Sequence, residues 1–195
     1  MGDPGGDRPR VVALLGGGVI GGGWAGRFML AGVDVRLFDP DPAAAEKVAA
    51  VLDNARRATA RLSLAPRPPE GRLELVATPE DAVEGADFVQ ESAPEREELK
   101  RALLALAGRA AGPGVVICSS TSGLRPSRLQ LDMPHPELMA VGHPFNPVYL
   151  LPLVEVCAGE LTAPETTAQA QAVYASVGMR PPAATVAPSF SAIGM

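Results

Sequence analysis

Three polar side chains in the second half of the chain are of the types needed for acid–base chemistry. His143 follows a short apolar run in VGHPFNP, Glu155 interrupts the apolar segment LVEVC, and Ser122 lies in SSTSG just after another apolar run. Each has an ordinary explanation when taken alone, as a loop histidine, a solvent-facing carboxylate and a turn serine. An ionised carboxylate within an apolar strand is costly unless it is paired or solvated, and an imidazole is a natural partner. A histidine paired in this way can act as a general base with a fixed tautomer.

A glycine-rich segment near the N-terminus has the spacing of a phosphate-binding turn. Residues 16–21, GGGVIG, fit the pattern GxGxxG and lie between a segment typical of a buried strand and one typical of a helix. The first glycine permits a tight turn, the second permits close approach of a pyrophosphate, and the third lets the helix pack against the strand. The residues expected to contact a dinucleotide here are Gly16, Gly18, Val19, Ile20 and Gly21.

An acidic residue ends the next apolar run. Asp39 lies 18 residues after Gly21 (39 − 21), where a carboxylate accepts hydrogen bonds from the hydroxyls of the adenosine ribose. A carboxylate there repels the additional phosphate of NADP, so the sequence predicts NAD as the cofactor. The alternative is that Asp39 is only a turn residue before Pro40. The strand, the glycines and the carboxylate together favour dinucleotide binding.

Short apolar runs alternate with helical segments along the chain. Strands are expected at residues 10–15, 33–38, 73–76, 88–91, 115–118, 138–141 and 153–157. Helices are expected at residues 23–32, from an Asp41 cap and Pro42 to about residue 63, near 79–84, at 95–109 and at 164–177. This alternation predicts an α/β fold of the Rossmann type, a doubly wound and mostly parallel sheet with helices on both faces. Ligands of such sheets bind at the carboxyl ends of the strands, which would place Ser122 beside the reactive ring of the cofactor.

The composition excludes several classes of protein. The chain has 195 residues, a net charge of −5 and 4% aromatic residues, so it lacks the basic footprint and the stacking surfaces of a nucleic-acid binder. No apolar stretch is long enough to span a bilayer, the two cysteines form neither a CxxC pair nor a disulfide scaffold, and no metal site is expected. We expect a cytoplasmic protein with one domain over residues 10–180, a disordered tail at 1–9 and an irregular tail at 181–195.

Five segments together resemble the N-terminal part of the 3-hydroxyacyl-CoA dehydrogenase superfamily. They are GGGVIGGGWAGRF, LFDPD, ESAPEREELK, SSTSGL and GHPFNPVYLLPLVEV, spread from about residue 10 to residue 180. The resemblance implies that His143 is the catalytic base, that Glu155 is its partner 12 residues later (155 − 143), and that Ser122 contacts the substrate.

The resemblance also implies roles for three further residues. Asn146 matches the asparagine of the H-x-x-N-P segment, and Glu95 and Lys100 match positions near the nicotinamide ribose. The implied reaction is a hydride transfer to NAD. In that reaction His143 takes the proton of the substrate 3-hydroxyl, Glu155 stabilises the imidazolium, and Ser122 donates a hydrogen bond to the reacting oxygen.

Substrate choice within the superfamily is a finer inference. The proline after the histidine and the segment VYLLPLVEV resemble the carnitine dehydrogenases, with 3-hydroxybutyryl-CoA and L-gulonate 3-dehydrogenases as alternatives. A quaternary ammonium group favours aromatic faces, for which Trp24, Phe145 and Tyr149 are candidates unless they are only core or wall. Family members are homodimers with a C-terminal helical domain, and we expect that domain to be absent from this chain. A truncated, non-catalytic NAD-binding module is therefore the alternative class of function.

Overall fold

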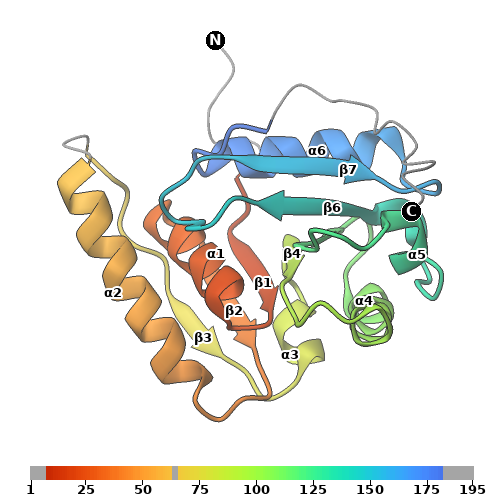
Figure 1. Ribbon diagram of the computed structural model, residues 1–195, viewed down its shortest axis with the longest axis horizontal. Coiled ribbons are helices and arrows are strands. Elements are labelled where there is room, and N and C mark those ends of the chain that lie inside the picture. The colour runs from red at the N-terminus through yellow and green to blue at the C-terminus, as the bar shows by residue number, and fades with distance from the viewer. Residues whose placement is uncertain (1–7, 63–65, 182–195) are drawn as a thin grey trace, which may run out of the picture.

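The computed structural model describes residues 8–62 and 66–181, and within them the chain forms one mixed sheet (Figure 1). The seven strands of this part are β1 (Val11–Leu15), β2 (Asp34–Phe38), β3 (Leu73–Leu75), β4 (Phe88–Glu91), β5 (Val116–Ser119), β6 (Met139–Pro144) and β7 (Val154–Ala158). They are ordered β3-β2-β1-β4-β5-β6-β7. Every neighbouring pair is parallel except β6 and β7, which are antiparallel. The predicted mostly parallel sheet is confirmed.

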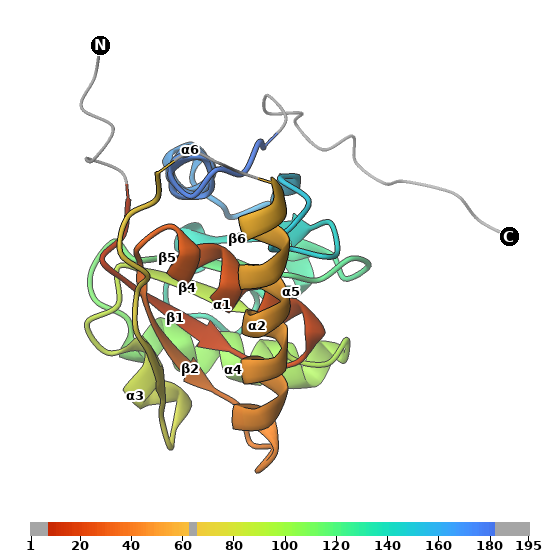
Figure 2. The same ribbon diagram turned by 90° about the vertical axis from the view of Figure 1, so that its left-hand side faces the viewer.

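Helices cover both faces of the sheet, as the sequence predicts. They are α1 (Val19–Leu30), α2 (Ala44–Leu62), α3 (Pro79–Val83), α4 (Glu97–Ala110), α5 (Pro126–Leu129) and α6 (Pro164–Ser176), with a 3-10 turn at Pro136–Leu138. One core cluster contains Trp24 and Phe28 of α1 together with Tyr174 of α6, and the other contains Leu104 of α4 and Leu129 of α5. Figure 2 shows α1 and α2 on one side of the sheet, where the two helices contact each other. No helix within the described residues is long and apolar enough to cross a membrane.

The strand order reverses between β1 and β4. From β1 the chain continues to β2 and β3 on one side, and from β4 it continues to β5 and β6 on the other. The loops that leave the carboxyl ends of β1 and β4 therefore separate at this point, and open α/β sheets bind their ligands in the crevice that results.

Helix α1 begins earlier than the sequence predicts. The expected start was Gly23, but α1 begins at Val19 and includes three consecutive glycines. A Cβ on Gly22 would lie 3.3 Å from Val51 of α2, and one on Gly23 would lie 2.9 Å from Val148. Glycine weakens an isolated helix by about 1 kcal/mol. Here the close approach of neighbouring segments favours glycine, and this tertiary contact cannot be read from local propensity.

Other element boundaries also differ from the prediction. Helix α2 starts at Ala44, two residues after the predicted start at Pro42, while the Asp41 carboxylate accepts the Ala43 amide at 2.8 Å, as expected of the predicted cap. Helix α4 starts at Glu97, which leaves Glu95 in the loop before it. The short helix α5 was not expected, since four residues give no periodic signal. Most of the two predicted tails, residues 1–7 and 182–195, lies outside the described residues.

Candidate active site

The three glycines of the turn after β1 have different structural roles. Gly16 has a φ of +107°, and a Cβ on it would lie 2.7 Å from the carbonyl oxygen of Ser92. A Cβ on Gly21 would lie 1.8 Å from the carbonyl oxygen of Gly16. The fold therefore requires both of these glycines. Gly18 has an ordinary φ of −68°, and nothing lies within 4 Å of the position a Cβ would take. Space is thus left open beside Gly18, as the binding of a pyrophosphate at this turn requires.

The N-terminus of α1 faces this open space and has the charge distribution that favours binding of an anion. Because α1 begins at Val19, the amides of Val19 and Ile20 are among the first N–H groups of a helix, which have no intrahelical acceptor. The first turn of α1 contains no acidic residue. These free donors and the positive end of the helix dipole are the features that bind phosphate groups.

Asp39 lies at the carboxyl end of β2 and is joined directly to the glycine turn. One carboxylate oxygen accepts the Gly17 amide at 2.6 Å, and the other accepts the Asp41 amide at 2.8 Å. The side chain is only partly buried. Asp39 therefore holds the turn in place while its carboxylate remains accessible, so its predicted contact with the adenosine ribose stays compatible with the structure.

His143 and Glu155 are brought together by the antiparallel pairing of β6 and β7. They are direct cross-strand partners, and Nδ1 of His143 lies 3.1 Å from Oε2 of Glu155. A carboxylate only accepts, so this contact places the proton on Nδ1 and leaves Nε2 able to take a proton. Two details of the prediction are wrong. His143 lies within β6 and not after it, because the ladder extends to Pro144. Glu155 is 52% exposed, so register and not burial produces the pair.

Ser122 lies in the loop after β5, where Glu95 holds the backbone. Oε1 of Glu95 accepts the amides of Ser122 and Gly123, both at 3.2 Å, and also the hydroxyl of Thr121. Ser122 itself is exposed. Since β5 and β6 are parallel neighbours with Ser119 opposite Val141, the loop of Ser122 and the end of β6 that bears His143 leave the same edge of the sheet.

Charge at Glu95 is expected to control the order of this loop. Burial alone raises the pKa of Glu95, but hydrogen bonds from Thr121 and Gly123 and the charge of Lys100 outweigh it, so the pKa lies below its ordinary value. A lowered pKa stabilises the folded loop above the unfolded pKa, and that stabilisation is lost as the pH falls through the folded value. We expect Glu95→Gln to remove this acid-range transition and to broaden or shift the Gly123 amide resonance at neutral pH.

An NMR pH titration that follows the Gly123 amide measures this effect. Glu98→Gln is the matched control, since Glu98 lies on the exposed side of α4, and it should leave the titration unchanged. An unchanged Gly123 titration in Glu95→Gln would show that the contacts of the Glu95 carboxylate with this loop do not form in solution.

Comparison with known proteins identifies the family. The model of the 3-hydroxyacyl-CoA dehydrogenase NAD-binding domain matches residues 11–185. This chain belongs to that family. It is 52% identical over 169 residues to an L-carnitine dehydrogenase/betainyl-CoA thioesterase of Rhizobium meliloti, and the aligned region covers 87% of this chain and 34% of that protein. It is also 52% identical over 172 residues to the L-carnitine dehydrogenase of Pseudomonas aeruginosa, and the aligned region covers 88% of this chain and 54% of that protein.

Solved structures agree with the assignment to this family. The chain resembles the NAD⁺-dependent 5-formyl-3-hydroxy-2-methylpyridine 4-carboxylic acid 5-dehydrogenase with a TM-score of 0.82 and 34% identity, over 88% of this chain and 56% of the other. It resembles the (S)-3-hydroxybutyryl-CoA dehydrogenase of Ralstonia eutropha with a TM-score of 0.78 and 27% identity, over 89% of this chain and 62% of the other. The chain therefore spans between a third and two thirds of the length of these relatives, and carries the NAD-binding domain.

Lys100 and Asn146, to which the resemblance assigns contacts with the cofactor and the substrate, differ in burial. Lys100 is 1% exposed, and its ammonium contacts Glu91 at 2.8 Å, the Ala93 carbonyl at 2.9 Å and Glu95 at 3.6 Å. The positive charge of Lys100 is thus paired with protein oxygens, and these contacts stabilise the loop that contains Glu95. Asn146 is exposed in the segment that joins β6 to β7. Their contacts with the nicotinamide ribose and the substrate remain predictions.

Buried polar groups that were not expected from the sequence lie beneath the predicted NAD site. Glu91 is fully buried, and besides Lys100 it accepts the Ser119 hydroxyl and the Ala93 amide, both at 2.5 Å. Removing one partner of such a pair leaves an uncompensated buried charge, a loss of about 3–5 kcal/mol. A second group connects Gln90, Ser92, Ser120, Trp24 and Tyr174. The sequence signal that could have indicated these groups is a glutamine followed by a glutamate at the end of a strand that was predicted to be buried.

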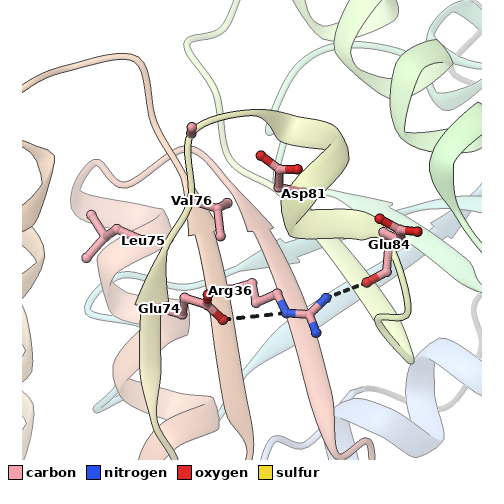
Figure 3. A pocket seen from close by; sticks show the side chains of 7 residues that line it. Arg36, Glu74, Leu75, Val76, Asp81 and Glu84 are labelled. Carbon is pink, nitrogen blue, oxygen red and sulfur yellow. Dashed lines mark hydrogen bonds and ion pairs between the residues drawn. The ribbon is translucent and has the colours of Figure 1, made fainter.

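A pocket of about 420 Å³ lies away from these residues, between the carboxyl half of β3, β2 and α3 (Figure 3). Its polar lining consists of Arg36, Glu74, Asp81 and Glu84. The Arg36 guanidinium donates to the Glu84 carbonyl oxygen and lies 3.8 Å from Glu74. No predicted site residue lines this pocket, and its arginine is already paired, so it takes no part in the proposed site.

Proposed function

We propose that this domain takes part in the NAD-dependent oxidation of the 3-hydroxyl group of L-carnitine to 3-dehydrocarnitine. The observation that carries the chemistry is the contact of 3.1 Å between His143 Nδ1 and Glu155 Oε2, at the edge of the sheet where the NAD-binding turn and the Ser122 loop lie. The substrate assignment is supported by the carnitine dehydrogenases that are about half identical to this chain.

Each residue has a distinct task in this proposal. His143 takes the proton of the 3-hydroxyl group at Nε2, and Glu155 holds the ring and stabilises the imidazolium that forms. Ser122 donates a hydrogen bond to the reacting oxygen from the loop that Glu95 holds. Asp39, the glycine turn and the first amides of α1 hold NAD, which accepts the hydride when bound.

Of the aromatic candidates for a quaternary ammonium group, Phe145 lies beside the proposed base and Trp24 does not. Trp24 is fully buried and lies 5.1 Å from Tyr174 in a stacked pair, so its face is not available. Phe145 is 40% exposed, and its ring centroid lies 5.8 Å from that of His143. In carnitine the ammonium nitrogen is two bonds from the carbon that bears the hydroxyl group. An aromatic face beside the base is therefore suitably placed for a cation–π contact.

Steady-state assays test this substrate assignment. With NAD we expect turnover of L-carnitine in preference to 3-hydroxybutyryl-CoA and L-gulonate, and Phe145→Leu should raise the KM for carnitine between about twofold and thirtyfold because the π face is lost. Phe145→Tyr retains that face and should keep the KM near that of the wild type. Preference for the thioester or gulonate would overturn the carnitine assignment. NAD binding without turnover of any of the three would support the alternative of a non-catalytic module.

We also propose a cytoplasmic location. The described residues hold Cys118 and Cys157 as free thiols, which is typical of proteins in a reducing compartment.

A further inference from the structure

Ser120, the first residue after β5, is the centre of a hydrogen-bond network beneath the NAD site. Its hydroxyl oxygen lies 3.1 Å from the Trp24 indole nitrogen, 2.8 Å from the Gln90 side-chain nitrogen and 2.9 Å from the Ser92 hydroxyl oxygen. The indole N–H can only donate. The direction of the other two bonds follows from the groups around them.

The orientation of the Gln90 amide is fixed on both sides. Its nitrogen lies 3.3 Å from the carbonyl oxygen of Gly142, which only accepts, and its oxygen accepts the Tyr174 hydroxyl at 2.5 Å. Burial raises the pKa of Tyr174 well above its ordinary value, so this hydroxyl keeps its proton. The Gln90 nitrogen therefore donates to Ser120.

These constraints determine where the Ser120 proton points. A hydroxyl oxygen has two acceptor sites, and on Ser120 both are filled by Trp24 and Gln90. Its single hydrogen must then be donated to Ser92, the remaining neighbour. Ser92 is consequently the acceptor in that contact. Among the contacts of the described residues, none uses the hydrogen of the Ser92 hydroxyl itself.

Ser92 lies at the point where the strand order reverses. It is the first residue after β4, its amide donates to Leu15 at the end of β1 at 2.7 Å, and its side chain is only partly buried. A Cβ placed on Gly21 would lie 3.5 Å from the Cβ of Ser92. The free hydroxyl hydrogen is thus beside the first turn of α1 and the glycine turn.

We propose that Ser92 is a cofactor-binding residue whose hydroxyl donates a hydrogen bond to an acceptor oxygen of the diphosphate–ribose part of NAD. Because Ser120 donates to it, the Ser92 hydroxyl is oriented as a donor before the cofactor arrives, and little ordering has to occur on binding. The proposal rests on NAD binding at the glycine turn, and it adds a side-chain donor from the strand on the opposite side of the crevice.

Calorimetric titration of the wild type and of Ser92→Ala with NAD, ADP-ribose, ADP and adenosine tests the proposal. We expect the Kd for NAD and ADP-ribose to rise about fivefold to tenfold in Ser92→Ala, since one hydrogen bond is lost, while the Kd for adenosine, which carries no phosphate, stays unchanged. If the Kd for ADP rises as well, the acceptor is a diphosphate oxygen. If only the Kd for ADP-ribose and NAD rises, the acceptor belongs to the ribose next to the nicotinamide. Both results support the proposal.

Controls separate this contact from a general distortion of the site. Ser127→Ala removes a hydroxyl whose one contact within the described part of the chain is with the Glu160 amide, and it should leave every Kd unchanged. If Ser92→Ala fails to fold, Ser92→Cys keeps the side-chain volume with only a weak donor and should show the same pattern. An unchanged Kd for NAD, or an equal loss for adenosine, overturns the role of Ser92. Failure of the wild type to bind NAD would instead overturn the proposed function.

Discussion

Replacing His143 with glutamine is expected to lower kcat for carnitine oxidation by about a thousandfold and to leave the Kd for NAD unchanged. Glutamine keeps polarity and approximate size but cannot take a proton, and a positioned general base contributes roughly 10²–10⁴ in rate. The glycine turn and Asp39 follow β1 and β2, which lie away from β6 in the sheet, so cofactor binding should not depend on the imidazole. Stopped-flow or steady-state absorbance of NADH, together with calorimetric titration of NAD, measures the two effects.

His135 provides a matched control. It is the other histidine of the chain, and its Nδ1 contacts Glu137 at 3.2 Å, nearly the geometry of His143 with Glu155. The His135 side chain is exposed, and the residue lies just before the 3-10 turn, outside the proposed site. His135→Gln should keep full activity. Comparable activity in His143→Gln and the wild type would remove His143 from the mechanism.

Replacing Gly21 with alanine is expected to lower the free energy of unfolding by about 3 kcal/mol or more and to abolish NAD binding. The added Cβ would lie 1.8 Å from the Gly16 carbonyl oxygen. That atom belongs to the backbone of the glycine turn and cannot rotate away as a flexible side chain would. Relief requires that α1 move away from the end of β1, which opens the turn. Urea denaturation followed by circular dichroism measures the change in stability.

The same substitution at Gly18 should separate cofactor binding from folding. Nothing lies within 4 Å of a Cβ there, and its φ of −68° suits any residue. Gly18→Ala is therefore expected to unfold at nearly the wild-type urea concentration while the Kd for NAD rises by more than about tenfold, because the methyl group occupies the space reserved for the pyrophosphate. Normal NAD binding by Gly18→Ala would contradict the assignment of this space to the cofactor.

Features that depend on local stereochemistry were predictable from the sequence. The apolar runs gave the seven strands within one or two residues, except that β6 extends three residues further than expected. The turn at Gly16 and its positive φ follow from the glycine spacing, because only glycine adopts that conformation without strain. The place of Asp39 at the end of β2 follows from the length of the strand. Each of these signals lies within a few residues of the structure it determines.

The arrangement of the side chains in space was decided only by the tertiary structure. The sequence suggested that His143 and Glu155 could meet, but the antiparallel register of β6 with β7 makes them direct partners. Contacts such as those from Glu95 to Ser122, 27 residues apart, and from Trp24 to Ser120, 96 residues apart, leave no periodic trace in the sequence. The chain thus determines its strands, turns and cofactor motif locally. The direction of each hydrogen bond in the site depends on which distant groups the folded sheet brings together.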